Sequence, residues 1–226
     1  MANNTYTTAT LIEGEVRASA AFSTSTSPTL AQVNGWIEEE SKEIEINTGM
    51  VFASTAISSE LNDYRNVDNI LRFPKTPLLS VDKIEYNVNS NNVAASWVTL
   101  ETGNGYNYLE YLDEGEVEFI SGNLASNKIS INDGKKKLRL SYTYGYTTTP
   151  LEIQKLTTLL VARRIINSLL NDQANTEGGS IQVGTIRVTD PTNFSVSYIQ
   201  SMNDNINDLY SSIGQKFRTF RGTRVY

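Results

Sequence analysis

Two apolar segments with a helical period lie far apart in this sequence, and they limit the folds that the chain can adopt. The first follows Ser27 and Pro28, a favourable helix cap and first helical position, and it stops at Thr48-Gly49. The second begins at Pro150 and is apolar over most of its circumference as far as Leu170. We therefore predict long helices over about 28–48 and 150–170 that belong to a small bundle, with the second helix at its centre.

The residues between these segments have the pattern of short strands and turns. Val117 and Phe119 alternate with Glu116 and Glu118, which is the period of a half-buried strand. Asp133-Gly134 is a strong hairpin turn before a strand that ends near Tyr144. The predicted class is α+β: a helical bundle with an inserted antiparallel β region and an extended C-terminal helix and arm.

The remainder of the chain extends this core. Apolar residues spaced three and four apart predict a helix over about 194–213, and residues 181–188 suggest a small hairpin before it. We divide the chain into an N-terminal extension at 1–27, a core at 28–190 that includes the β region 71–146, and a C-terminal helix and basic arm at 191–226.

Composition removes several classes of chemistry. The chain of 226 residues has no Cys and no His, which excludes disulfides, thiolate catalysis, Cys/His zinc sites and His-based triads. Paired carboxylates such as Asp113/Glu114 fall in turns or on exposed strand faces, where solvated charge is expected rather than acid–base catalysis. We therefore expect no enzymatic activity, no metal and no cofactor.

The sequence also bears on where the protein acts. No apolar stretch reaches the roughly 18 residues that a membrane-spanning helix needs, and residues 1–6 lack the basic and apolar regions of a secretory signal. We expect no membrane partner and a protein that acts in the cytoplasm or in a particle assembled there.

Charge is unevenly distributed. Four basic residues and no acidic ones lie within 216–226, and removing their charge from the net −6 leaves −10 for residues 1–215. Aromatic residues alternate with these basic ones, whereas disordered tails are usually poor in aromatics. The composition favours docking of this arm on an acidic surface, with a solvated tail or nucleic-acid binding as the alternatives.

Several short motifs follow one another in a definite order along the chain. A helix begins with Leu-Ala-Gln-Val at Leu30 to Val33 and ends in Thr48-Gly49. A Pro-Leu-Leu-Ser-Val strand entry follows at 77–81, then Trp97 and a strand pair over 106–120. Last come Tyr142-Thr143-Tyr144-Gly145-Tyr146 and the helix that begins at Pro150. In this order the motifs resemble the head–tail connector (adaptor) proteins of tailed bacteriophages and related prokaryotic viruses; the resemblance covers about 28–190, and the terminal segments are additional to it.

This resemblance implies a structural virion protein at the neck, on the portal vertex of the capsid, assembled in the host cytoplasm. Such proteins form a ring, usually of twelve subunits, that binds the portal protein above it and a neck or tail protein below it. Genomic DNA passes through the ring channel without sequence-specific binding. A ring needs two different complementary patches on each subunit, and an acidic body suits a channel through which DNA slides.

Family members commonly grip the portal with a C-terminal segment, so the resemblance assigns portal binding to the arm. The residues concerned are Lys216, Phe217, Arg218, Phe220, Arg221, Arg224 and Tyr226. Candidates for the subunit interface are Arg163, Arg164, Tyr142, Tyr144 and Tyr146, although core or strand packing is the commoner use of such tyrosines.

Two further functions fit the same sequence. The chain could be another neck or tail subunit, such as a tail terminator or baseplate component, whose partner would be the tail tube. It could also be a carbohydrate-binding adhesin module that uses Trp97 with Tyr106, Tyr108 and Tyr111.

Overall fold

The computed structural model describes most of the chain, and it groups these residues into two compact units. The described residues are 4–18, 20–64, 69–89, 94–103, 107–120, 134–174, 181–183, 186–188 and 191–218. Within them, only the backbone is described for 170–174, 181–183, 186–188, 191–196 and 217–218. One unit is formed by both ends of the chain, 1–52 with 149–226, and the other is the segment 53–148 inserted between them.

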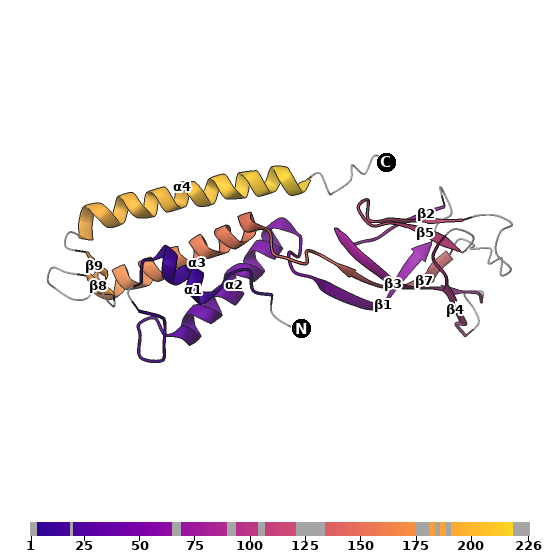
Figure 1. The fold of residues 1–226 in the computed structure, drawn as a ribbon, viewed down its shortest axis with the longest axis horizontal. Coiled ribbons are helices and arrows are strands. Elements are labelled where there is room, and N and C mark those ends of the chain that lie inside the picture. Colours follow the sequence, from indigo (N-terminus) through magenta and orange to yellow (C-terminus); the bar gives the residue numbers. More distant parts are fainter. Residues whose placement is uncertain are drawn as a thin grey trace. The chain divides into compact units, whose positions relative to one another are not determined.

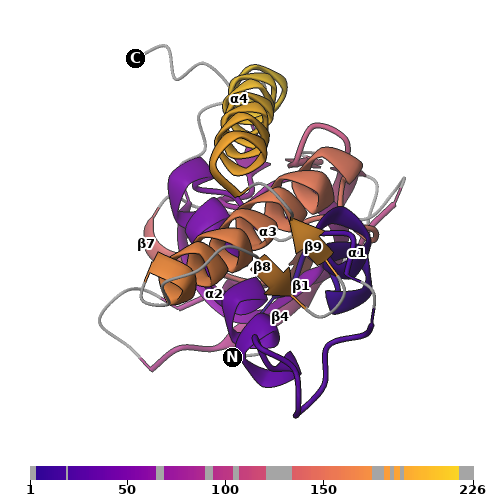
Figure 2. The same ribbon diagram turned by 90° about the vertical axis from the view of Figure 1, so that its left-hand side faces the viewer.

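The helical unit contains the two long helices that the sequence predicts. Its helices are α1 (Ala9–Glu15), α2 (Leu30–Thr48), α3 (Leu151–Ala174) and α4 (Pro191–Arg218), and a small antiparallel hairpin, β8 (Ile181–Val183) with β9 (Ile186–Val188), precedes α4. Helix α3 contacts α1, α2 and α4, and Figure 2 shows it lying among them. The prediction that this largely apolar helix is central is confirmed, and α4 belongs to the same compact unit as the other helices.

Helix α2 begins two residues later than the sequence suggests. Its cap is Thr29, whose side chain accepts from Gln32 N while the Gln32 side chain accepts from Thr29 N, 2.9 Å away. This reciprocal pair satisfies donors at both positions, which Ser27 cannot do from outside the helix. At the other end, Gly49 adopts a left-handed conformation and ends α2 as predicted.

The Thr29 cap gives a direct test of where α2 begins. Thr29→Ala should lower the free energy of unfolding by about 1 kcal/mol, because it removes the side-chain acceptor at the helix N-terminus. Urea unfolding followed by circular dichroism measures this. Thr147→Ala, at an exposed loop position, is the control and should change stability little; equal losses in both variants would argue against the cap.

The β unit is built from two antiparallel sheets. The larger sheet has the order β1-β7-β3-β4 and the smaller one β2-β6-β5. Their bounds are β1 Thr55–Tyr64, β2 Ile70–Arg72, β3 Leu78–Asn87, β4 Trp97–Leu100, β5 Tyr108–Tyr111, β6 Glu116–Phe119 and β7 Gly134–Tyr144. Strand β1 starts the β region well before residue 71, where the sequence analysis placed its beginning. The α+β class with an inserted antiparallel region is confirmed.

The two sheets of the β unit pack face to face, as Figure 1 shows for β2 and β5 lying over β3 and β7. Every second residue of β7 from Leu138 to Tyr144 is buried, and so are Val117 and Phe119 of β6. Aromatic rings join the layers: Tyr64 lies 5.3 Å from Phe119, centroid to centroid, in an edge-to-face arrangement. The core of this unit therefore lies between the sheets, and each sheet keeps one outward face.

Candidate assembly surfaces

The C-terminal arm is described only at its beginning. Lys216 lies in the last turns of α4, and its ammonium is 2.5 Å from the Glu152 carboxylate at the start of α3. Phe217 and Arg218 belong to the same helix. The other predicted portal-binding residues, Phe220, Arg221, Arg224 and Tyr226, lie outside the described residues. The predicted arm is therefore partly helix, and its first cation is paired with the protein's own body.

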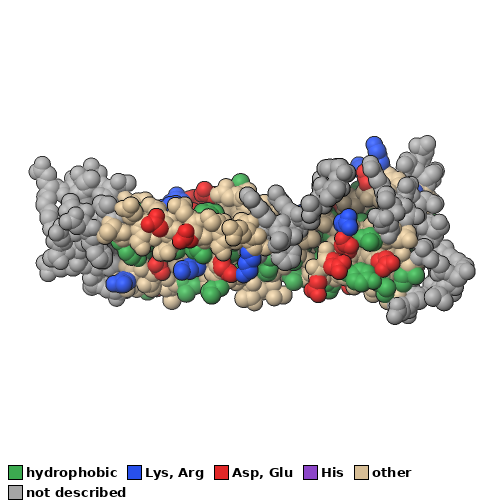
Figure 3. Space-filling view, turned by 90° about the horizontal axis from the view of Figure 1, so that it is seen from above, with side chains coloured by type: hydrophobic (Ala, Val, Ile, Leu, Met, Phe, Trp, Pro, Cys, Tyr) green, Lys and Arg blue, Asp and Glu red, His purple; other side chains and the backbone are tan. Residues whose placement is uncertain are grey.

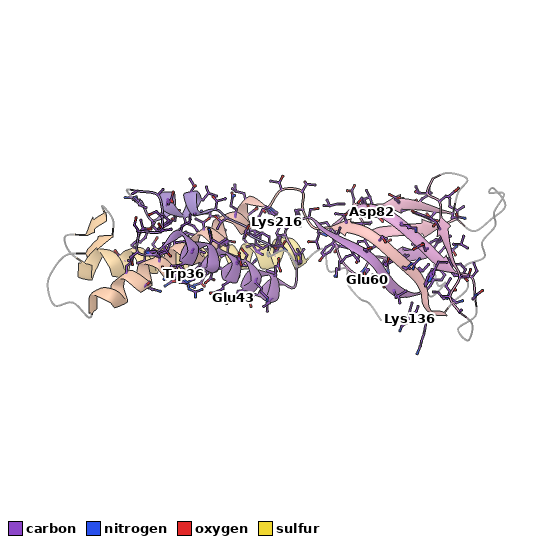
Figure 4. All side chains as sticks on the ribbon, turned by 90° about the horizontal axis from the view of Figure 1, so that it is seen from below. Trp36, Glu43, Glu60, Asp82, Lys136 and Lys216 are labelled. Carbon is purple, nitrogen blue, oxygen red and sulfur yellow. The ribbon has the colours of Figure 1, made fainter. Side chains whose placement is uncertain are left out.

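Arg164 was predicted at a subunit interface, and the structure places it between helices of its own subunit. Its Nη1 lies 2.5 Å from Glu39 Oε2 and 3.5 Å from Glu40 Oε1 on α2. The guanidinium carbon also lies 5.3 Å from the ring centroid of Trp36. Figure 4 labels Trp36 on α2. These contacts give Arg164 the role of a clamp between α2 and α3.

Arg163, the preceding residue of α3, makes a similar contact with α4. Its Nη1 donates to Asn203 Oδ1 of α4 over 3.1 Å. Consecutive arginines of α3 therefore point to different helices and hold both. The interface prediction for this pair stays a prediction, and both side chains have partners within their own subunit.

The acidic residues facing this clamp are partly shielded from water. Burial raises the pKa of Glu40 above its ordinary value, and the neighbouring Glu43 acts in the same direction. Arg164 and Arg163 oppose this shift. Burial is also the main cause of the raised pKa of Tyr210 on α4. The arginines thus stabilise a carboxylate that α2 carries into the helix interface, which is a structural role.

Tyr142 and Tyr144 do not form an assembly surface. Tyr142 is fully buried, its ring centroid lies 4.8 Å from that of Phe73, and its hydroxyl donates to Glu60 Oε2 over 2.7 Å. Tyr144 is buried beside it in the same strand. The interface prediction is wrong for these two residues, and the core reading is confirmed. The third tyrosine, Tyr146, is half-buried beyond the end of β7.

The glycan alternative requires aromatic residues that gather on one surface, and the structure separates them. Trp97 lies half-buried in the larger sheet. The guanidinium carbon of Arg139 lies over it, 4.6 Å from the centroid of the Trp97 ring. Tyr108 and Tyr111 lie in the smaller sheet, where Tyr108 is buried in the core. Tyr106 lies outside the described residues. The residues that are described do not form a shared sugar-stacking platform.

The chain leaves and re-enters the helical unit through residues that pack closely on one another. Gly145 has φ of +100°, and a Cβ built on it would lie 2.1 Å from the carbonyl oxygen of Ala53. Gly145 N also donates to Pro77 O over 2.8 Å. Ala53, Gly145 and the Pro77 strand entry therefore meet at one point of the β unit, and only glycine fits at position 145.

A hydrogen-bond network in the helical unit holds Phe52, the last residue before the β unit. The Tyr6 hydroxyl donates to Glu45 Oε1 and accepts from Phe52 N, 3.0 Å away. Asn4 Nδ2 donates to the same Glu45 oxygen over 2.8 Å, and Tyr6 N donates to Ser41 Oγ over 3.2 Å. No sequence pattern indicated this hydrogen-bond network, because its residues are far apart in the chain and belong to no motif.

The described part of the chain offers little for other chemistry. Within it, no group of three or more carboxylates is arranged to hold a metal ion. The helices in the same described ranges are all too short or too polar to cross a bilayer.

Comparisons with known proteins give no sequence match and a loose structural similarity. No protein-family model and no curated protein matches the sequence. Among solved structures, a chain from the neck of an empty GTA particle, computed with C6 symmetry, is similar with a TM-score of 0.39 and 13% sequence identity. The match covers 82% of this chain and 92% of that one. A TM-score this low carries no argument about function.

Proposed function

We propose that this chain is a structural protein of a virion neck: a head–tail connector that forms a ring beneath the portal and docks the next neck or tail protein. The observation that carries the proposal is where the motifs lie. Gly49 ends α2 just before the β unit. Within that unit Gly145 donates to Pro77 O and lies against Ala53, and Pro150 precedes α3. The motifs of the connector resemblance therefore lie around one architectural feature, a β unit inserted between two packed helices.

The surface of α4 is consistent with a structural role. Its buried residues Met202, Ile206 and Ile213 form one side, and Asp204 and Asp208 are exposed. The other exposed side chains described between residues 197 and 215 are serine, asparagine and glutamine. A polar helix face with few charges, all of them negative, would neither bind DNA nor repel a neighbouring subunit strongly.

The test is co-sedimentation with the portal ring of the same virus. The chains compared are the full-length protein and residues 1–218, since ending after Arg218 keeps α4 and the Lys216–Glu152 pair intact. Binding by the full-length chain alone would support a connector held by residues 219–226. Binding by both would support a connector whose portal contact lies in its body.

Binding by neither chain would overturn the connector proposal. Binding to the tail tube in the same assay would then favour the other neck or tail subunit. A matched control is the double variant Asp204→Ala with Asp208→Ala, which changes exposed charges of α4 without touching the arm.

A further inference from the structure

The outward face of the smaller sheet carries acidic side chains on its central strand, β6, and apolar side chains on the two edge strands. The register places Glu118 opposite Ile70 and Glu116 opposite Tyr111, so these four side chains share a face. Asp113 and Glu114 are exposed in the turn at its end. We call these six residues the acidic face, and Figure 3, which views this side of the β unit, shows acidic side chains beside hydrophobic ones.

The acidic face keeps most of its charge. Arg72 pairs with Glu116 over 2.6 Å, and the Tyr111 hydroxyl donates to Glu118 over 3.1 Å. Within the described ranges, one cation, Arg72, pairs with one of these four carboxylates, so the excess charge is negative. Tyr111 is 41% exposed and Ile70 is 36% exposed, so apolar area is also open to a partner. An exposed face of this kind fits a partner that is basic and partly apolar.

The outward face of the larger sheet, on the other side of the same unit, has the complementary character. Arg139 of β7 is paired with Leu61 of β1 on one side and with Glu85 of β3 on the other. Lys83 precedes Glu85 by two residues in β3 and therefore lies on the same face. Lys135 and Lys136 are exposed at the start of β7. We call Leu61, Lys83 and Arg139, together with the exposed Lys135 and Lys136 at the adjoining end of β7, the cationic face, and Leu61 is 49% exposed.

The acidic groups of the cationic face are largely compensated or lie at its margins. Glu85 is buried between Arg139, 2.6 Å away, and Lys83, 2.7 Å away, and the hydrogen bond from Arg139 lowers the pKa of this carboxyl. Asp63 accepts from Lys136 N over 2.8 Å. Asp82 lies toward the end of the sheet away from Lys136, as Figure 4 shows.

From these two faces we propose that the acidic face of one copy binds the cationic face of the next copy. The contact is heterologous, because each subunit contributes two different patches, and repeating it generates a ring or an open series. A second copy is the occupant that the structure favours, because both complementary patches belong to the same unit and lie on its opposite sides. That the repeated contact closes into a ring rests on the proposed function; the inference adds which surfaces of neighbouring subunits touch.

Charge exchange between two variants tests this contact. The first variant is Asp113→Lys with Glu114→Lys, and the second is Lys135→Glu with Lys136→Glu. Sedimentation velocity of the wild-type chain over a concentration series should show association that weakens as salt rises. Each variant alone should associate at least about tenfold more weakly, because like charges then face each other. An equimolar mixture of the two variants should regain association, since each then offers the charge that the other lacks.

Two controls and two outcomes complete the test. The controls reverse the same number and sign of charges on the helical unit, and they should leave association unaltered. They are Asp204→Lys with Asp208→Lys, and Lys42→Glu with Lys155→Glu. Circular dichroism verifies that each variant is folded. A wild-type chain that stays monomeric, or variants that fail to recover when mixed, would overturn the proposal. Portal binding is a separate measurement, so loss of portal binding with intact self-association would count against the connector alone.

Discussion

Replacing Gly145 with alanine should destabilise the β unit by about 3 kcal/mol or more. The added Cβ would lie 2.1 Å from the Ala53 carbonyl oxygen and 2.9 Å from its carbon, and these are backbone atoms that no rotamer change can move. The φ of +100° adds strain, since side chains other than glycine rarely adopt it. Backbone strain and overpacking each cost about 1–3 kcal/mol, and here both act together.

The two tryptophans allow this loss to be assigned to one unit. Trp97 lies in the β unit and Trp36 in the helical unit, so a Trp36→Phe background reports the β unit by fluorescence during urea unfolding. Gly35→Ala is the matched control, because nothing lies within 4 Å of its added Cβ and α2 should gain up to about 1 kcal/mol. If Gly145→Ala were as stable as the wild type, Gly145 could not be in close contact with Ala53.

Sequence reasoning found the motif that contains Gly145 but not the reason for it. The Tyr-Gly-Tyr pattern was informative because its position follows a strand and precedes a proline-started helix. The carbonyl of Ala53, however, lies more than ninety residues away along the chain. Long-range approaches of backbone atoms leave no periodic signal, so they become visible only in the folded structure.

The errors in the strand assignments also have physical causes. The sequence left residues 50–70 open as an irregular strand and loop, because β1 pairs only with β7 among the described strands and has one buried residue in ten, Tyr64. Such an edge strand has too few apolar residues to show an alternating pattern. Tyr142 and Tyr144, in contrast, continue the alternation of Leu138 and Leu140, and that period could have assigned them to the core.

The N-terminal segment is a second feature that the sequence did not predict, and its centre is Tyr6. Tyr6 is 2% exposed, and its ring lies edge-to-face with Phe52 at 5.9 Å between centroids. Burial is the main cause of its raised pKa, and the hydrogen bond to Glu45 raises it further. The segment that precedes α1 is thereby fastened to the C-terminal part of α2 and to the residue where the helical unit ends.

Tyr6→Phe should therefore lower the free energy of unfolding of the helical unit by about 2 kcal/mol or more. It removes one hydrogen bond to a carboxylate and the hydroxyl that accepts from Phe52 N, and such bonds contribute about 0.5–3 kcal/mol each. Because the aromatic ring remains, packing is nearly unchanged. Urea unfolding followed by Trp36 fluorescence in a Trp97→Phe background measures the loss in this unit.

Tyr111→Phe is the control, read by Trp97 fluorescence in the Trp36→Phe background because Tyr111 lies in the β unit. It removes an exposed hydroxyl that also donates to a carboxylate, and it should change stability by at most about 0.5 kcal/mol. Alkaline pH gives a second measurement. A raised folded-state pKa means that the contribution of the neutral hydroxyl is complete below about pH 10 and is lost as the pH rises through the higher folded-state value. The difference between the wild type and Tyr6→Phe should then shrink. A small difference at neutral pH that does not change in alkali would contradict a structural role for this hydroxyl, and α2 would have to hold the N-terminal segment by packing alone.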